Sequence, residues 1–212
     1  KHMKISPTLT EVKEIAKTGK YDILPVSCEI LSDFITPIEA MRILQNVSTH
    51  CYLLESAQAN EAWGRYTFLG YDPKLEINCI DGHMKLGKLS VETENPSEYI
   101  RQILSEYKSP KFDYLPSFTG GLVGYFSYDY LGYKEKSIRG KARDTEDFKD
   151  VDLMLFDKVI AFDNLCQKII LIANMSLDAP ETGYNKAIVE LKQLRELLMH
   201  GEKKQNMGGK LL

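Results

Sequence analysis

Two strongly apolar stretches in the C-terminal half constrain the fold most. VDLMLFDKVIAFD (151–163) and KIILIAN (168–174) are rich in Val, Ile, Leu and Phe, and only the residues NLCQ (164–167) separate them. Residues of these types favour strands, and so short a connection favours antiparallel pairing. The sequence therefore predicts a long β-hairpin in this part of the chain.

Helices and further strands surround this hairpin without a regular alternation. A capping box followed by proline predicts a helix that begins after Thr36, and a second one predicts a helix that begins after Asn95. Asp81-Gly82 predicts a tight hairpin turn. The predicted strands are 22–31, 51–56, 65–71, 74–80 and 118–129, and the predicted helices are 8–18, 37–47, 96–108 and 181–199. This mixture predicts an α+β fold, with antiparallel sheets and flanking helices.

The composition argues against several classes of function. The 212 residues suffice for one sizeable domain or two small ones, and 27 basic against 30 acidic residues give a net charge of −3 without a basic stripe. Nucleic acid and membrane are therefore not expected as partners, since no apolar run approaches the roughly 20 residues of a membrane helix. The cysteines and histidines lack metal-ligand spacing, which predicts reduced thiols in a cytoplasmic protein. Lys1-His2 resembles a remnant of cloning.

The sequence contains no recognisable catalytic apparatus. Gly120, Gly121 and Gly124 lie in FTGGLVGYF, but they form no phosphate-loop motif and no helix follows them. Glycines inside a strand more often permit a bulge or the close approach of another backbone. A nucleophile elbow and a Cys–His pairing are equally absent from the pattern.

CYLLES (51–56) begins as a buried strand but ends on the polar Glu55 and Ser56. If this strand pairs with RYTFLGY, then Trp63, Arg65 and Tyr66 gather near the same end. Carboxylate, guanidinium and aromatic groups suit a small zwitterionic ligand. The alternative is structural: Ser56 caps its own backbone, and Arg65 pairs with a surface acid.

Four motifs in this order resemble a known family. CYLLESA, W-G-RYTFLGYDP, FTGGLVGYFSYD and VDLMLFDKVIAFD are similar to the N-terminal domain of anthranilate synthase component I, the chorismate-using large subunit of tryptophan biosynthesis. The resemblance runs from about residue 5 to 199, so it implies a domain over 4–200 and a tail or linker over 201–212. In this family the L-L-E-S stretch lines the L-tryptophan feedback site. The ligand-binding residues implied are Leu54, Glu55, Ser56, Trp63, Arg65, Tyr66 and Thr67.

The resemblance also implies a division of labour. In this family chorismate, Mg²⁺ and the catalytic residues belong to a C-terminal domain, and the chain ends at Leu212 before such a domain. The fragment is therefore expected to hold no catalytic residue, metal or cofactor, and to be inactive alone. The intact enzyme would convert chorismate and ammonia to anthranilate and pyruvate, with ammonia supplied from glutamine by an amidotransferase subunit. L-tryptophan would inhibit it allosterically, from a site that the C-terminal domain completes.

Two alternatives remain open at the level of the sequence. The parent protein could be aminodeoxychorismate synthase component I of the folate pathway, which shares the fold and similar motifs. The chain could also be a structural domain whose pocket has lost its ligand. Tryptophan binding and product analysis would distinguish these alternatives.

Overall fold

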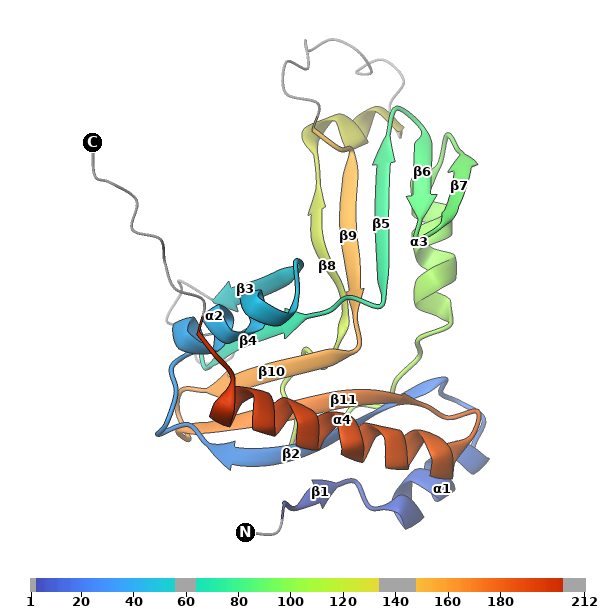
Figure 1. Cartoon of the computed structure of the whole chain (residues 1–212). Coiled ribbons are helices and arrows are strands. Elements are labelled where there is room, and N and C mark those ends of the chain that lie inside the picture. Colours follow the sequence, from blue (N-terminus) through green and yellow to red (C-terminus); the bar gives the residue numbers. More distant parts are fainter. Residues whose placement is uncertain (1–2, 56–63, 134–147, 204–212) are drawn as a thin grey trace, which may run out of the picture. The chain divides into compact units, whose positions relative to one another are not determined.

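Each strand-rich part of the chain forms its own antiparallel sheet. The computed structural model describes residues 3–55, 64–133 and 148–203 (Figure 1). Unit 1 comprises Lys1–Asp72, Ser109–Thr119 and Asp157–Leu212, and unit 2 comprises Pro73–Lys108 and Gly120–Phe156. The predicted α+β fold with antiparallel sheets is confirmed.

Unit 1 is built on a six-stranded sheet in the order β1-β2-β11-β10-β4-β3. β11 pairs with β2 along one side of Pro25. On the other side β1 pairs only with Ser27 and Cys28, so the proline faces an open stretch of β2. The strands are β1 (Ile5–Ser6), β2 (Ile23–Leu31), β11 (Lys168–Ser176), β10 (Lys158–Asp163), β4 (Tyr66–Tyr71) and β3 (Cys51–Glu55).

Three helices cover one face of this sheet. They are α1 (Leu9–Lys17), α2 (Pro37–Val47) and α4 (Pro180–His200), and Figure 1 shows α4 running along the sheet. The hydroxyls of Thr8 and Thr36 each accept a hydrogen bond from the backbone N–H of the glutamate three residues on. The carboxylate of that glutamate accepts a hydrogen bond from the backbone N–H of the threonine. The apolar faces of the helices and of β2, β10 and β11 form a common core, which includes Val12, Leu44, Leu171 and Leu191.

Unit 2 is built on a five-stranded sheet in the order β7-β6-β5-β9-β8. Asp81 and Gly82 adopt φ values of +49° and +83°, as the predicted tight turn requires. The elements are β5 (Leu75–Ile80), β6 (His83–Leu86), β7 (Leu89–Glu92), α3 (Pro96–Ser105), β8 (Gly121–Phe126), the 3-10 helix η1 (Tyr128–Tyr133) and β9 (Val151–Phe156).

Three local predictions were wrong. Asn95 does not cap α3: its side chain accepts a hydrogen bond from the Ser97 hydroxyl instead, and the helix ends at Ser105 rather than near 108. The strand predicted over 118–129 covers only Gly121–Phe126, and η1 follows it. Residues 151–163 form two strands rather than one, because the chain leaves the sheet of unit 2 at Asp157 and enters that of unit 1.

The predicted hairpin is therefore shorter than expected. β10 pairs with β11 from Lys158↔Ala173 to Asp163↔Lys168, while β9 pairs with β5 and β8. Between its two ends, the apolar run 151–163 contains three polar residues, Asp152, Asp157 and Lys158. The adjacent pair Asp157 and Lys158 lies where the run divides into two strands.

Candidate functional site

Pairing of β3 with β4 brings the two predicted ligand-binding stretches together. β3 is one of the two edge strands of the six-stranded sheet, and Leu54 lies opposite Phe68 while Glu55 lies opposite Thr67. The predicted strand pairing is thus confirmed. Ser56 and Trp63 lie outside the described residues.

One face of this strand pair is aromatic. The Phe68 ring lies 5.8 Å from the Tyr66 ring and 5.5 Å from the Phe118 ring, which also contacts Tyr52 at 6.4 Å between centroids. Leu54 shares this face with Phe68, because residues directly opposite in an antiparallel pair project to the same side. Its side chain is 44% exposed, so it offers apolar surface at the rim of the aromatic cluster.

Glu55 and Thr67 project to the other face, because side chains alternate along a strand. Glu55 is exposed, whereas Thr67 is buried and its hydroxyl accepts a hydrogen bond from the Asn164 amide at 3.3 Å. The structure therefore places Leu54 and Tyr66 on one side and Glu55 and Thr67 on the other. A ligand that contacts both Leu54 and Glu55 must lie across the end of the edge strand.

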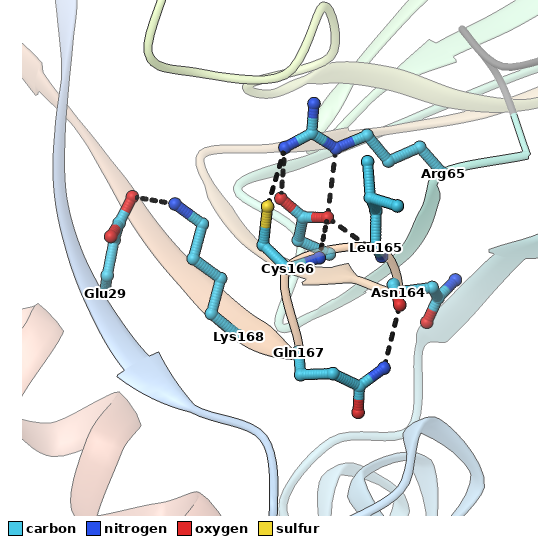
Figure 2. A network of polar contacts seen from close by, with 8 residues as sticks. Glu29, Arg65, Asn164, Leu165, Cys166, Gln167 and Lys168 are labelled. Carbon is cyan, nitrogen blue, oxygen red and sulfur yellow. Dashed lines mark hydrogen bonds and ion pairs between the residues drawn. The ribbon is translucent and has the colours of Figure 1, made fainter.

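Arg65 is engaged by a buried acid at the start of β4. Its Nε donates to Oδ1 of Asp163 at 3.0 Å and its Nη2 donates to Oδ2 at 2.6 Å, while Nη1 projects away from the pair (Figure 2). Nη2 also lies 3.4 Å from Sγ of Cys166, and the guanidinium lies 5.0 Å from the centre of the Tyr66 ring. Arg65 thus pairs with an acid, as the structural alternative predicted, but this acid is buried rather than on the surface.

Asp163 is the centre of this network. The backbone N–H groups of Leu165 and Cys166 donate to its Oδ1 at 3.1 and 3.0 Å. Burial by itself would raise the pKa of Asp163, but the hydrogen bonds from Arg65 and Cys166 outweigh it and lower the pKa to about 2. The hydrogen bonds that Arg65 donates to Asp163 in turn raise the pKa of Arg65. Asp163 was missed at the level of the sequence, although an aspartate that ends an apolar strand before a short turn is a recognisable signal.

A second polar cluster lies in unit 2. The Tyr133 hydroxyl donates to Oδ2 of Asp150 at 2.7 Å and accepts from the Gly82 backbone N–H at 2.7 Å. Asp150 also accepts from the Asp81 backbone N–H at 2.9 Å. Burial raises the pKa of Tyr133, so this hydroxyl stays protonated. The cluster joins η1 to the β5–β6 turn, a structural role that the sequence pattern did not reveal.

Residues 3–55, 64–133 and 148–203 hold neither a cluster of metal ligands nor a helix suited to a bilayer. No group of three or more His, Cys, Asp or Glu side chains in these ranges is arranged to hold a metal ion. In the same ranges no helix combines the length and apolar character needed to cross a bilayer. The four cysteines all belong to the described residues and form no disulfide, and Cys166 is exposed at the β10–β11 turn.

Comparison with known proteins gives consistent relatives. No protein-family model matches the chain. The chain is 34% identical over 198 residues to anthranilate synthase component 1 of Acetivibrio thermocellus, covering 91% of this chain and 39% of the relative. It is 36% identical over 196 residues to that of Pseudomonas aeruginosa, covering 89% and 39%.

A solved structure agrees with the sequence relatives. Anthranilate synthase component I from Streptococcus pneumoniae superposes with a TM-score of 0.50 at 25% identity, covering 78% of this chain and 36% of that one. The chain thus spans about two fifths of the length of the curated relatives that it matches.

Proposed function

This chain is related to anthranilate synthase component I over most of its length, as its motifs predicted, and we propose that it is the N-terminal, L-tryptophan-binding region of such an enzyme. The proposal is supported by a similarity that covers about 90% of this chain but only about 39% of the relatives, as an N-terminal fragment would. The intact enzyme acts in the cytoplasm in amino-acid biosynthesis and converts chorismate and ammonia to anthranilate and pyruvate.

The observation that carries the proposal is the β3–β4 register. It places an exposed apolar side chain, Leu54, and an exposed carboxylate, Glu55, at the end of one edge strand. Glu55 can receive the ligand's ammonium group, and Leu54 with the Tyr66 ring can contact its indole. Arg65 has two of its three nitrogens committed to Asp163, so we assign it the role of holding this end of the sheet. Backbone N–H groups then receive the ligand's carboxylate.

Regulation follows from this assignment. Under this proposal the catalytic residues and the Mg²⁺ site lie in a further domain of the intact enzyme, and a glutamine amidotransferase subunit supplies ammonia. Tryptophan favours a conformation of the intact enzyme that is poorly suited to catalysis. By thermodynamic linkage, chorismate and tryptophan then weaken each other's binding by the same factor.

An isotope-edited NMR titration of this chain with L-tryptophan tests the site directly. We expect shifts at Leu54 and Glu55 that D-tryptophan and L-phenylalanine do not reproduce. Glu55→Gln should weaken binding about tenfold, because it removes a charge-assisted hydrogen bond. Glu181→Gln, on α4, makes the same change of charge and should have no effect. Identical shifts with both enantiomers would contradict the proposal, as would unchanged affinity in Glu55→Gln.

The proposed location of the catalytic residues in another domain makes a separate prediction. With chorismate, ammonia and Mg²⁺, this chain should yield no anthranilate, because the proposed catalytic residues lie outside it. The measurement is anthranilate fluorescence, with the longer protein as positive control. Turnover by the short chain would contradict the proposal. An aminated chorismate as the product of the longer protein would favour aminodeoxychorismate synthase instead.

A further inference from the structure

A hollow of about 430 Å³ lies in unit 1, away from the β3–β4 edge. Its lining comes from three segments: the end of β1 with the proline that follows it, the first two turns of α1, and two aromatic residues of the segment 112–114. Its volume falls within the range of about 300–1,000 Å³ that is typical of small-molecule sites. The residues that matter for its chemistry are Pro7, Glu11, Glu14, Ile15, Phe112 and Tyr114.

Two aromatic rings form one wall of this hollow. Phe112 and Tyr114 stack with their centroids 5.1 Å apart and their planes at 19°. Phe112 packs against the core of unit 1, and its carbonyl accepts a hydrogen bond from the Leu115 backbone N–H at 3.0 Å. The wall is thus held by the core and by a turn. Tyr114 is 46% exposed, and the negative face of an aromatic ring attracts cations.

Two carboxylates also line the hollow. Glu11 and Glu14 are three residues apart on α1 and therefore lie on the same side of the helix. The Glu11 carboxylate is fixed, because the backbone N–H and hydroxyl of Thr8 donate to it at 2.7 and 2.8 Å and lower its pKa. Glu14 pairs with Lys17 at 2.6 Å, where both side chains are exposed.

The lining of the hollow therefore combines two glutamates with apolar surface and contains no Lys, Arg or His, and Lys17 pairs with Glu14 from outside the lining. Burial, with a smaller contribution from Glu11, raises the pKa of Tyr114 to about 12, so its phenol is neutral near pH 7. An anion would meet the charge of Glu11 and the oxygens of the Glu14–Lys17 pair, whereas an ammonium group would meet two carboxylates and a ring face. Pro7 and Ile15 leave apolar surface for a ligand body.

We infer that this hollow binds an organic cation, namely a protonated amine attached to an aromatic or apolar body. The ammonium group lies between Glu11 and Glu14, and the body packs against Tyr114 and Ile15. This site is independent of the proposed tryptophan site, since none of its residues belongs to β3 or β4.

A titration with phenethylamine, monitored by isotope-edited NMR at pH 7, tests the inference. We expect shifts at Glu14, Ile15 and Tyr114, and none at Leu54. The anion 3-phenylpropionate has a similar body and should produce no shifts there. Glu14→Gln should weaken phenethylamine about fivefold or more, because it removes one of the two carboxylates while leaving the helix cap intact.

Glu181→Gln is the matched control, since it removes the same charge from an exposed position on α4 and should leave affinity unchanged. The inference is overturned if phenethylamine at about 10 mM, well above a millimolar Kd, shifts none of these residues. It is also overturned if the anion binds equally well, or if the two variants weaken binding equally. None of these outcomes bears on tryptophan binding, which is measured at different residues.

Discussion

Asp163→Asn should destabilise unit 1 by about 2–3 kcal/mol at pH 7. The substitution removes the charge that pairs with Arg65 and leaves one carbonyl oxygen where two carboxylate oxygens accept four hydrogen bonds. Breaking a buried ion pair typically costs about 3–5 kcal/mol. We expect a loss at or below the lower end of this range, because the Arg65 side chain is 33% exposed. Denaturant unfolding, with amide exchange in β10 and β11 to locate the effect, measures this loss. Asp33→Asn, at an exposed position of the same unit, is the control.

The same residue predicts a pH dependence. Hydrogen bonds lower the pKa of Asp163 to about 2 in the folded chain, whereas an unfolded aspartate titrates near about 3.9. Stability from this group is therefore complete above about pH 4 and decreases as the pH falls towards about 2. The difference in unfolding free energy between the wild type and Asp163→Asn should shrink over that interval. A difference that is constant with pH, or absent at pH 7, would contradict the role assigned to Asp163.

The elements that could be predicted from the sequence are those whose signals are local. The capping box at Thr36 forms, and the Asp81-Gly82 turn has the predicted conformation, because the interacting groups lie within three residues. Asn95 had the same local signal and does not cap, because its own conformation and the Ser97 hydroxyl divert its side chain. Local signals therefore locate helices well but do not guarantee each cap.

Features that depend on distant partners could not be predicted. Asp163 is 98 residues from Arg65, so a pattern could suggest a polar role for either residue but not their pairing. The division of 151–163 between two sheets depends likewise on which strands lie alongside. At the candidate site the sequence predicted that β3 and β4 meet, but not that Leu54 and Glu55 project to opposite faces. The strict alternation of side chains along a strand could have predicted that these two side chains project to opposite faces.

Gly124→Ala should disrupt the outer edge of unit 2 at a cost of about 3 kcal/mol or more. A Cβ at this position would lie 1.9 Å from the Asp152 carbonyl oxygen and 2.9 Å from the Leu153 Cα, both of which are backbone atoms that cannot rotate away. The φ of +153° adds strain for any residue with a side chain. We expect loss of amide protection in β8 and β9, measured by hydrogen exchange, together with a lower Tm.

Gly121→Ala separates steric overlap from backbone strain. Gly121 has a φ of +133°, but a Cβ there would meet no atom within 4 Å, so its substitution should cost only the strain, about 1–2 kcal/mol. A larger effect at Gly124 than at Gly121 would establish that the missing side chain at Gly124 allows the β9 backbone to approach closely. This is a structural reason for the Gly-rich motif. Equal and small effects at both positions would contradict that explanation. The glycines of FTGGLVGYF would then have to be explained by something other than the packing of β8 against β9.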